Sequence, residues 1–195
     1  MQSHFSMIWE SVADSVPEHV ALIQGERQIS WRDYEDRSAR LAQGLIDAGL
    51  GHNSKVGMYL YNSPEYAETN FAAMKIGGVP INVNYRYLDD ELHYLLENAD
   101  IEVLVFHSSL GDRLARVRSR LPMLKAMICV GDGPAEDGSM GPTTGIPYDT
   151  FLAQASGTAK TQPQGDEIYM LYTGGTTGMP KGVMYPLDAF TEFFM

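Results

Sequence analysis

Short apolar blocks and longer amphipathic blocks take turns along this chain. The apolar blocks are rich in β-branched side chains, as is typical of strands buried on both faces of a sheet. Alternation of strands with helical segments predicts an α/β fold, in which a layered βαβ, parallel-type sheet carries helices on its faces through right-handed crossovers. The strands are expected at residues 56–61, 79–83, 101–106 and 126–130, and the helices at 63–76, 89–98 and 110–120.

The first fifty residues predict a small hairpin followed by a long helix. Residues 1–16 form an irregular or helical lead-in, and residues 20–23 and 28–30 flank a turn that contains Gly25. Ser30 is expected to cap the helix with Asp33 as its capping-box partner, and Gly49 to end it in the left-handed conformation. Helical spacing assigns its buried face to Tyr34, Ser38, Leu41, Leu45 and Ala48.

The last third of the chain predicts two polar loops and two further strands. Residues 131–147 are rich in Gly, Pro, Ser and Asp and are expected to form a surface loop, after which the sheet resumes. A short helix at 148–155, a second polar loop at 156–165 and a strand at 166–173 follow. Another apolar stretch covers 182–185, so the glycine-rich segment from Tyr172 to Gly182 is predicted to join two strands.

This glycine-rich segment has the chemistry of a phosphate-binding loop. Its small residues leave backbone N–H groups accessible, its threonines add hydroxyls, and Lys181 adds a positive charge. It is not a Walker A loop, because Pro180 precedes the lysine and Gly182 follows it. The dinucleotide fingerprint G-x-G-x-x-G is also absent. From spacing alone, phosphate binding and a plain flexible turn remain equal alternatives.

Composition narrows the class of protein. The 195 residues are 44% hydrophobic and 20% charged, which is sufficient for one domain-sized core. The net charge of -11 disfavours a nucleic-acid partner, because such partners require basic residues to neutralise phosphates. Cys129 is the single cysteine, which excludes an internal disulfide and suits a cytoplasmic location. We expect no transmembrane segment and no signal peptide.

Other chemically active residues are expected to have structural roles. The five histidines (His4, His19, His52, His93 and His107) lack the spacing of metal ligands. Cys129 is interpreted as a small core residue, and the acids at 89–91 as partners of a helix dipole. Asn82, Asn84, Tyr85 and Arg86 follow a strand at the edge where open α/β sheets bind ligands. A structural role is favoured for them over ligand binding.

The segment from Tyr172 to Val183 resembles the signature of the adenylate-forming superfamily, which includes acyl-CoA synthetases, luciferases and the adenylation domains of peptide synthetases. The family pattern is Tyr-Thr-Ser-Gly-Thr-Thr-Gly-x-Pro-Lys-Gly, and Gly174 replaces its serine here. Residues 21–34, 41–42 with Gly49, 55–58, 62–65 and 71–82 are also similar to the family's N-terminal region. Residues 83–87, together with Gly174 and Met179, are most similar to bacterial synthetases for fatty or other bulky acyl groups.

The resemblance implies that ATP activates a carboxylic acid as an acyl-adenylate, and that a thiol, often coenzyme A, then accepts the acyl group. The phosphates of ATP would be bound by Thr173, Gly174, Gly175, Thr176, Thr177, Gly178 and Lys181. Thr176 and Lys181 are the predicted catalytic residues, and Thr173 is the predicted contact of Mg²⁺. The loss of the serine hydroxyl at Gly174 is expected to weaken the grip on pyrophosphate, unless a backbone N–H replaces it.

The resemblance also predicts that residues 1–195 are the N-terminal part of an AMP-binding domain, truncated after the phosphate-binding loop and without the C-terminal domain. The predicted partners are the acid, ATP and coenzyme A. Two alternatives remain: a catalytically inactive phosphate-binding or scaffolding fragment, and, within the family, an aryl-CoA ligase or a peptide-synthetase adenylation domain. The identity of the acid and the oligomeric state are not predicted.

Overall fold

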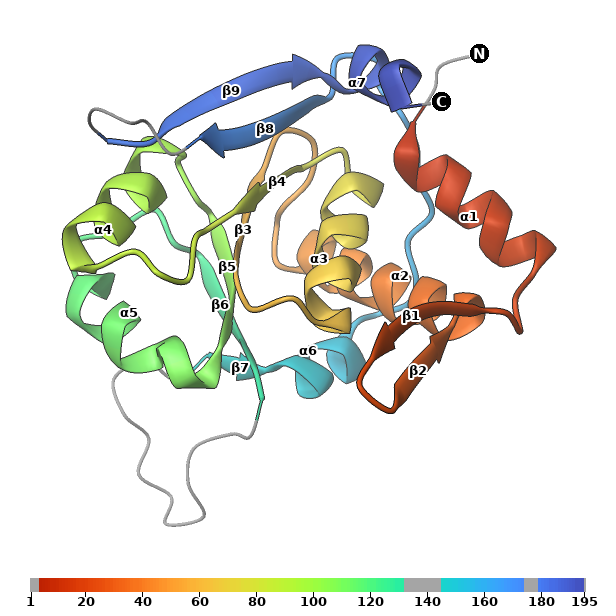
Figure 1. The fold of residues 1–195 in the computed structure, drawn as a ribbon, viewed down its shortest axis with the longest axis horizontal. Coiled ribbons are helices and arrows are strands. Elements are labelled where there is room, and N and C mark those ends of the chain that lie inside the picture. Colours follow the sequence, from red (N-terminus) through yellow and green to blue (C-terminus); the bar gives the residue numbers. More distant parts are fainter. Residues whose placement is uncertain (1–3, 132–144, 174–178, 195) are drawn as a thin grey trace.

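The computed structural model describes residues 4–131, 145–173 and 179–194. At its centre lies a parallel sheet of five strands (Figure 1). Their order is β4 (Val79–Asn82), β3 (Lys55–Tyr59), β5 (Val103–His107), β6 (Ala126–Val130) and β7 (Ile146–Pro147). The predicted α/β class and the four predicted core strands are therefore confirmed. The short strand β7 lies at the end of the segment that was expected to be a loop, while residues 132–144 lie outside the described residues.

Helices cover both faces of this sheet, as the apolar strands predicted (Figure 1). Val103 and Val105 of β5 belong to the hydrophobic cluster on one face, and Leu104 and Phe106 belong to the cluster on the other. The first face is covered by α2 (Trp31–Asp47), α3 (Pro64–Lys75) and α6 (Tyr148–Gln154), and the second by α4 (Asp89–Asn98), the 3₁₀ turn η1 (Ser108–Leu110) and α5 (Gly111–Arg118).

Both predicted caps of α2 are present, but the Asp33 carboxylate accepts from the Ser30 hydroxyl rather than from the Ser30 backbone N–H of a capping box. The backbone N–H of Asp33 donates to the Ser30 hydroxyl at the N-terminus. At the C-terminus, Gly49 has a φ of 80°, and the N–H of Leu50 donates to the carbonyl of Leu45, as in a Schellman motif. One expectation is wrong: Ala48 is exposed rather than buried, because it is the C-cap residue, where the helical spacing no longer applies.

The N-terminal elements pack beside α2 and α3. The lead-in is helical as α1 (Phe5–Ser15), and the predicted hairpin is formed by the antiparallel strands β1 (Val20–Gln24) and β2 (Arg27–Ser30). Ring contacts of Trp9 and Tyr34 with the fully buried Phe71 join α1 and α2 to α3. None of the helices in the described ranges is long and apolar enough to cross a membrane.

The strands that flank the glycine-rich loop form a sheet of their own. Strand β8 (Ile168–Thr173) pairs antiparallel with β9 (Lys181–Pro186), and helix α7 (Leu187–Phe194) follows. The sequence predicted that the central sheet resumes after the polar loop at 131–147. The short β7 does join that sheet, but β8 and β9 do not, so the expectation is wrong for these two strands. Strand β8 lies beside β4 but shares no backbone ladder with it (Figure 1). A short apolar run predicts a strand, but the pairing partner is decided by contacts distant in sequence.

Candidate functional site

The loop end of the β8–β9 hairpin, where the chain passes from one strand to the other, carries the glycine-rich segment. Thr173 is paired with Lys181, and Tyr172 is paired with Gly182, so these two pairs form the base of the loop. The predicted phosphate-binding residues Gly174, Gly175, Thr176, Thr177 and Gly178 lie outside the described residues. Their roles therefore remain predictions, whereas the positions of Thr173 and Lys181 at the base of the loop are described.

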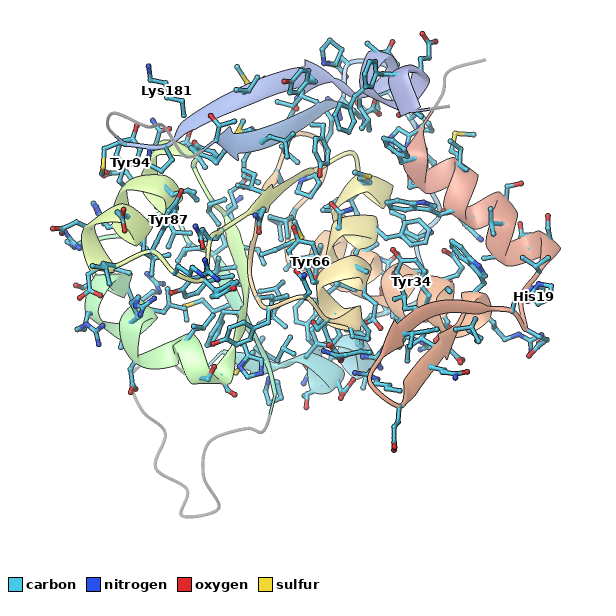
Figure 2. All side chains as sticks on the ribbon, in the orientation of Figure 1. His19, Tyr34, Tyr66, Tyr87, Tyr94 and Lys181 are labelled. Atoms are coloured by element: carbon cyan, nitrogen blue, oxygen red, sulfur yellow. The ribbon has the colours of Figure 1, made fainter. Side chains whose placement is uncertain are left out.

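Thr173 and Lys181 present a hydroxyl and an ammonium group at this end of the hairpin. Both residues are exposed. The Thr173 hydroxyl donates to the Lys181 carbonyl over a long 3.5 Å, which leaves its lone pairs available to a ligand. The Lys181 side chain projects away from the body of the molecule (Figure 2), and it forms no ion pair with any residue in the described ranges. Together, the Thr173 hydroxyl and the Lys181 ammonium group suit an anionic ligand.

Tyr172 fixes the inner side of the loop base. A Cβ added to Gly182 would lie 3.1 Å from the Cε2 and Cζ atoms of Tyr172, so the missing side chain leaves room for the ring. The Tyr172 hydroxyl donates to Asn98 Oδ1, at the end of α4, over 2.8 Å. Burial raises the pKa of this phenol, so the hydroxyl keeps its proton at neutral pH. No pattern in the sequence indicated that Asn98 contacts the loop base.

A cavity of about 250 Å³ lies between the carboxyl ends of β3 and β4 and the end of β8. Its walls carry amide and phenol groups and no charged side chain. They are formed by Leu60, Asn62, Asn82, Asn84, Tyr85, Tyr87 and Tyr172. The sequence pointed to four polar residues at the carboxyl end of β4. Asn82, Asn84 and Tyr85 line the cavity, and Arg86 does not.

Hydrogen bonds within the segment after β4 agree with the structural role favoured for it. The Asn84 side-chain carbonyl accepts from the backbone N–H of Arg86. The Arg113 guanidinium of α5 donates to the carbonyls of Tyr85 and Tyr87 over 2.9 and 2.7 Å. Arg113 therefore holds one wall of the cavity in place. Its role was missed because a single arginine on an amphipathic helix has no distinguishing pattern.

The segment that leads into β8 is fixed to the N-terminal helices. The N–H and hydroxyl of Thr161 both donate to the Glu10 carboxylate, at 3.0 and 2.8 Å. The ammonium of Lys75, whose side chain is completely buried, donates to Glu10 and to Glu35. Burial alone would raise the pKa of Glu10, but the hydrogen bonds from Lys75 and Thr161 hold it below the ordinary value.

The remaining candidate residues are described by other side-chain contacts. Among the described residues, no group of three His, Cys, Asp or Glu side chains is arranged to hold a metal ion. His4 contacts Ser6, His52 contacts Asp166, and His107 contacts Ser109. Cys129 is half-buried in β6, and burial raises the pKa of its thiol. The acids at 89–91 begin α4 as predicted, and Glu91 accepts from the N–H of Leu88.

The family model described as AMP-binding enzyme matches residues 9–194 of this chain. The chain belongs to the AMP-binding enzyme family. This match confirms the resemblance seen in the loop signature and extends it over nearly the whole sequence.

Among individual proteins, the chain is similar to bacterial enzymes named as CoA ligases. The chain is 41% identical over 177 residues to 3-oxocholest-4-en-26-oate–CoA ligase of Rhodococcus rhodochrous, with 90% of this chain and 32% of the relative covered. It is 39% identical over 181 residues, with the same coverage of both chains, to a medium/long-chain-fatty-acid–CoA/3-oxocholest-4-en-26-oate–CoA ligase of Mycobacterium marinum.

A crystal structure of the anthranilate CoA ligase AuaEII, in complex with anthranoyl-AMP, has a similar fold. Its TM-score is 0.85 at 22% identity, and the match covers 96% of this chain and 35% of that one. Since the identity is low, this likeness concerns the fold alone. The chain spans about a third of the length of each of these three AMP-binding relatives.

Proposed function

We propose that this chain is the N-terminal part of an ATP-dependent acid–thiol ligase, which converts a carboxylic acid into an acyl-adenylate and then into an acyl-CoA. The observation that carries the proposal is the loop end of the β8–β9 hairpin. There Thr173 and Lys181 flank a loop with the AMP-binding signature. Residues 1–195 would form the N-terminal part of the adenylation domain, and a C-terminal domain would follow them.

In the proposed first step, a carboxylate oxygen of the acid attacks the α-phosphorus of ATP. The bond from that phosphorus to the bridging oxygen breaks, and pyrophosphate leaves with the electron pair. Negative charge grows on the leaving oxygens, and donors fixed in advance around them lower the barrier. We assign this charge stabilisation to Thr176 and Lys181, and the binding of the phosphates to Thr173, Gly174, Gly175, Thr176, Thr177, Gly178 and Lys181.

Mg²⁺ fits the same end of the hairpin. It prefers oxygen ligands and is usually shared between substrate phosphates and a few protein oxygens. The Thr173 hydroxyl suits this role, because its one hydrogen bond among the described residues is long. When bound, the ion would neutralise phosphate charge, while Thr173 orients it relative to the loop.

The acid is proposed to be a fatty or other bulky carboxylic acid. Two relatives at 39–41% identity are named for a medium or long fatty acid or for a 3-oxocholestenoate, and this supports the substrate class. Aryl acids and the amino acids of peptide synthetases are the alternatives within the family. We propose a cytoplasmic location, where ATP and coenzyme A are available.

The proposal is tested by ATP-dependent release of pyrophosphate. The longest reading frame that carries this chain is expressed and assayed with fatty, polycyclic, aryl and amino acids, and the 195-residue chain is assayed beside it. We expect release by the longer protein with fatty or polycyclic acids. Release with aryl or amino acids alone would change the substrate class. No release with any acid would leave the non-catalytic alternative.

A further inference from the structure

Side chains, and not a backbone ladder, join the loop base to the body that contains the central sheet. Strands β8 and β9 form a separate sheet and share no backbone ladder with the five-stranded one. The inner side chains Ile168, Met170 and Tyr172 pack against the cluster around α4 and α5. Apolar packing of this kind holds β8 close to the cluster, but it is not directional. The orientation of the loop base must therefore be set by other contacts.

We infer that Asn98 is a positioning residue, which acts through Tyr172 to set the orientation of the ladder pair Thr173 and Lys181 at the loop base. Asn98 is the last residue of α4, and its Oδ1 atom accepts from the Tyr172 hydroxyl over 2.8 Å. Tyr172 immediately precedes Thr173 in β8. The inference rests on the proposed function only for its consequence in catalysis.

The ring of Tyr172 is constrained from a second side. Its Cε2 and Cζ atoms lie where a Cβ at position 182 would be only 3.1 Å away, and real Cβ contacts are rarely so short. Tyr172 and Gly182 are also partners in the ladder. The ring therefore lies between the backbone of β9 and the end of α4. A displacement of the ring would shift the next ladder pair, Thr173 and Lys181, which flanks the loop.

Tyr169 of the same strand provides a matched control. Its ring stacks on Phe190 of α7 at a centroid distance of 4.7 Å, so it points to the other side of β8. Its hydroxyl has no hydrogen-bond partner among the residues that the structure describes. Tyr169→Phe removes the same atom from the same strand as Tyr172→Phe, and only the second change breaks the contact with Asn98.

The first experiment needs no catalytic activity. Hydrogen exchange of peptides that cover residues 168–186 is compared in Tyr172→Phe, Asn98→Leu and Asn98→Asp, with Tyr169→Phe as the control. A hydrogen bond contributes about 0.5–1.5 kcal/mol, so exchange around Thr173 and Lys181 should accelerate about 2- to 10-fold in Tyr172→Phe and Asn98→Leu. Asn98→Asp keeps an acceptor and should preserve the slow exchange. Equal exchange in Tyr172→Phe and Tyr169→Phe would overturn the inference.

The second experiment uses the longer protein in the pyrophosphate assay. Tyr172→Phe and Asn98→Leu should each lower kcat/KM for ATP about 2- to 10-fold and leave KM for the acid unchanged, and the double variant should be no worse than either single one. Additive losses, or losses shared by Tyr169→Phe, would contradict a positioning role. If the unmodified protein releases no pyrophosphate, the proposed function fails, and hydrogen exchange still decides whether Asn98 orients the loop base.

Discussion

The ammonium of Lys75 and the carboxylate of Glu10 form an ion pair across 65 residues of sequence. Lys75 lies in α3 and Glu10 in α1, and Glu35 of α2 binds the same ammonium. Thr161, in the segment before β8, binds the same carboxylate of Glu10. This buried network therefore joins three helices to the segment that leads to the candidate site.

Replacement of Lys75 should destabilise the fold strongly. Lys75→Met leaves the Glu10 and Glu35 carboxylates close together without their shared cation, and removal of one partner of a buried pair costs about 3–5 kcal/mol. Lys125→Met breaks an exposed pair with Glu102 and should cost at most about 1 kcal/mol. Urea unfolding measures both. Equal losses of unfolding free energy would show that the buried network contributes no more than a surface pair.

The contribution of Glu10 should depend on pH in one direction. Its pKa in the folded state is held below the ordinary value, so its stabilisation is complete above the pKa of the unfolded chain, about 4.3, and is lost as the pH falls through the folded value. Glu10→Gln should therefore lower the unfolding free energy at pH 7, and the difference from the unmodified chain should shrink below about pH 4. A difference that is constant between pH 7 and 3 would be inconsistent with this linkage.

Gly44 should not tolerate a side chain. A Cβ at this position would lie 2.6 Å from Cε1 of Phe151, where α2 packs against α6. Gly44→Ala should cost about 1–3 kcal/mol by overpacking. Gly51→Ala is the control, because no atom lies within 4 Å of the added Cβ. Thermal unfolding of the two variants makes the comparison, and an equally small change in Tm for both would argue against tight packing at this contact.

If Lys181 has the proposed role, Lys181→Ala in the longer protein should lower kcat/KM for ATP by about 10²-fold, because the substitution removes a donor to developing charge. KM for the acid should change little. Lys181→Arg keeps the charge and should retain most of the activity. Steady-state kinetics of pyrophosphate release give both constants. If alanine and arginine have the same effect, charge at this position is not what the reaction uses.

Gly174→Ser restores the residue that the family signature carries. The added hydroxyl is expected to tighten the binding of ATP and pyrophosphate, and the measured quantities are KM for ATP and inhibition by pyrophosphate. Unchanged values would mean that position 174 is merely permissive.

The sequence predicted the central sheet well because its signals are local. Apolar runs marked the buried strands, and Ser30 and Gly49 marked the ends of α2 through hydrogen bonds within a few residues. Lys75 and Glu68 gave no such signal. Both are buried, with partners in distant helices, and periodicity alone expects apolar side chains at buried positions.

The candidate site also combines features that the sequence predicted with features that it did not. The loop signature pointed to Thr173 and Lys181 as candidates because their chemistry is local to one segment, and the structure pairs them at the loop base. The contact between Tyr172 and Asn98 joins residues 74 positions apart, and the separation of β8 and β9 from the central sheet is decided by contacts between distant segments. Neither relationship can be read from spacing, and both emerge only when the elements are assembled.

The central claim, acid activation at the α-phosphate of ATP, is tested most directly by oxygen-18 transfer. The longer protein is incubated with ATP, coenzyme A and a fatty or polycyclic acid labelled with oxygen-18 in its carboxyl group, and the AMP is analysed by mass spectrometry. Since the attacking carboxylate oxygen stays on phosphorus when the acyl group leaves, we predict one labelled oxygen in each AMP. Unlabelled AMP, or ADP with labelled inorganic phosphate, would contradict the account.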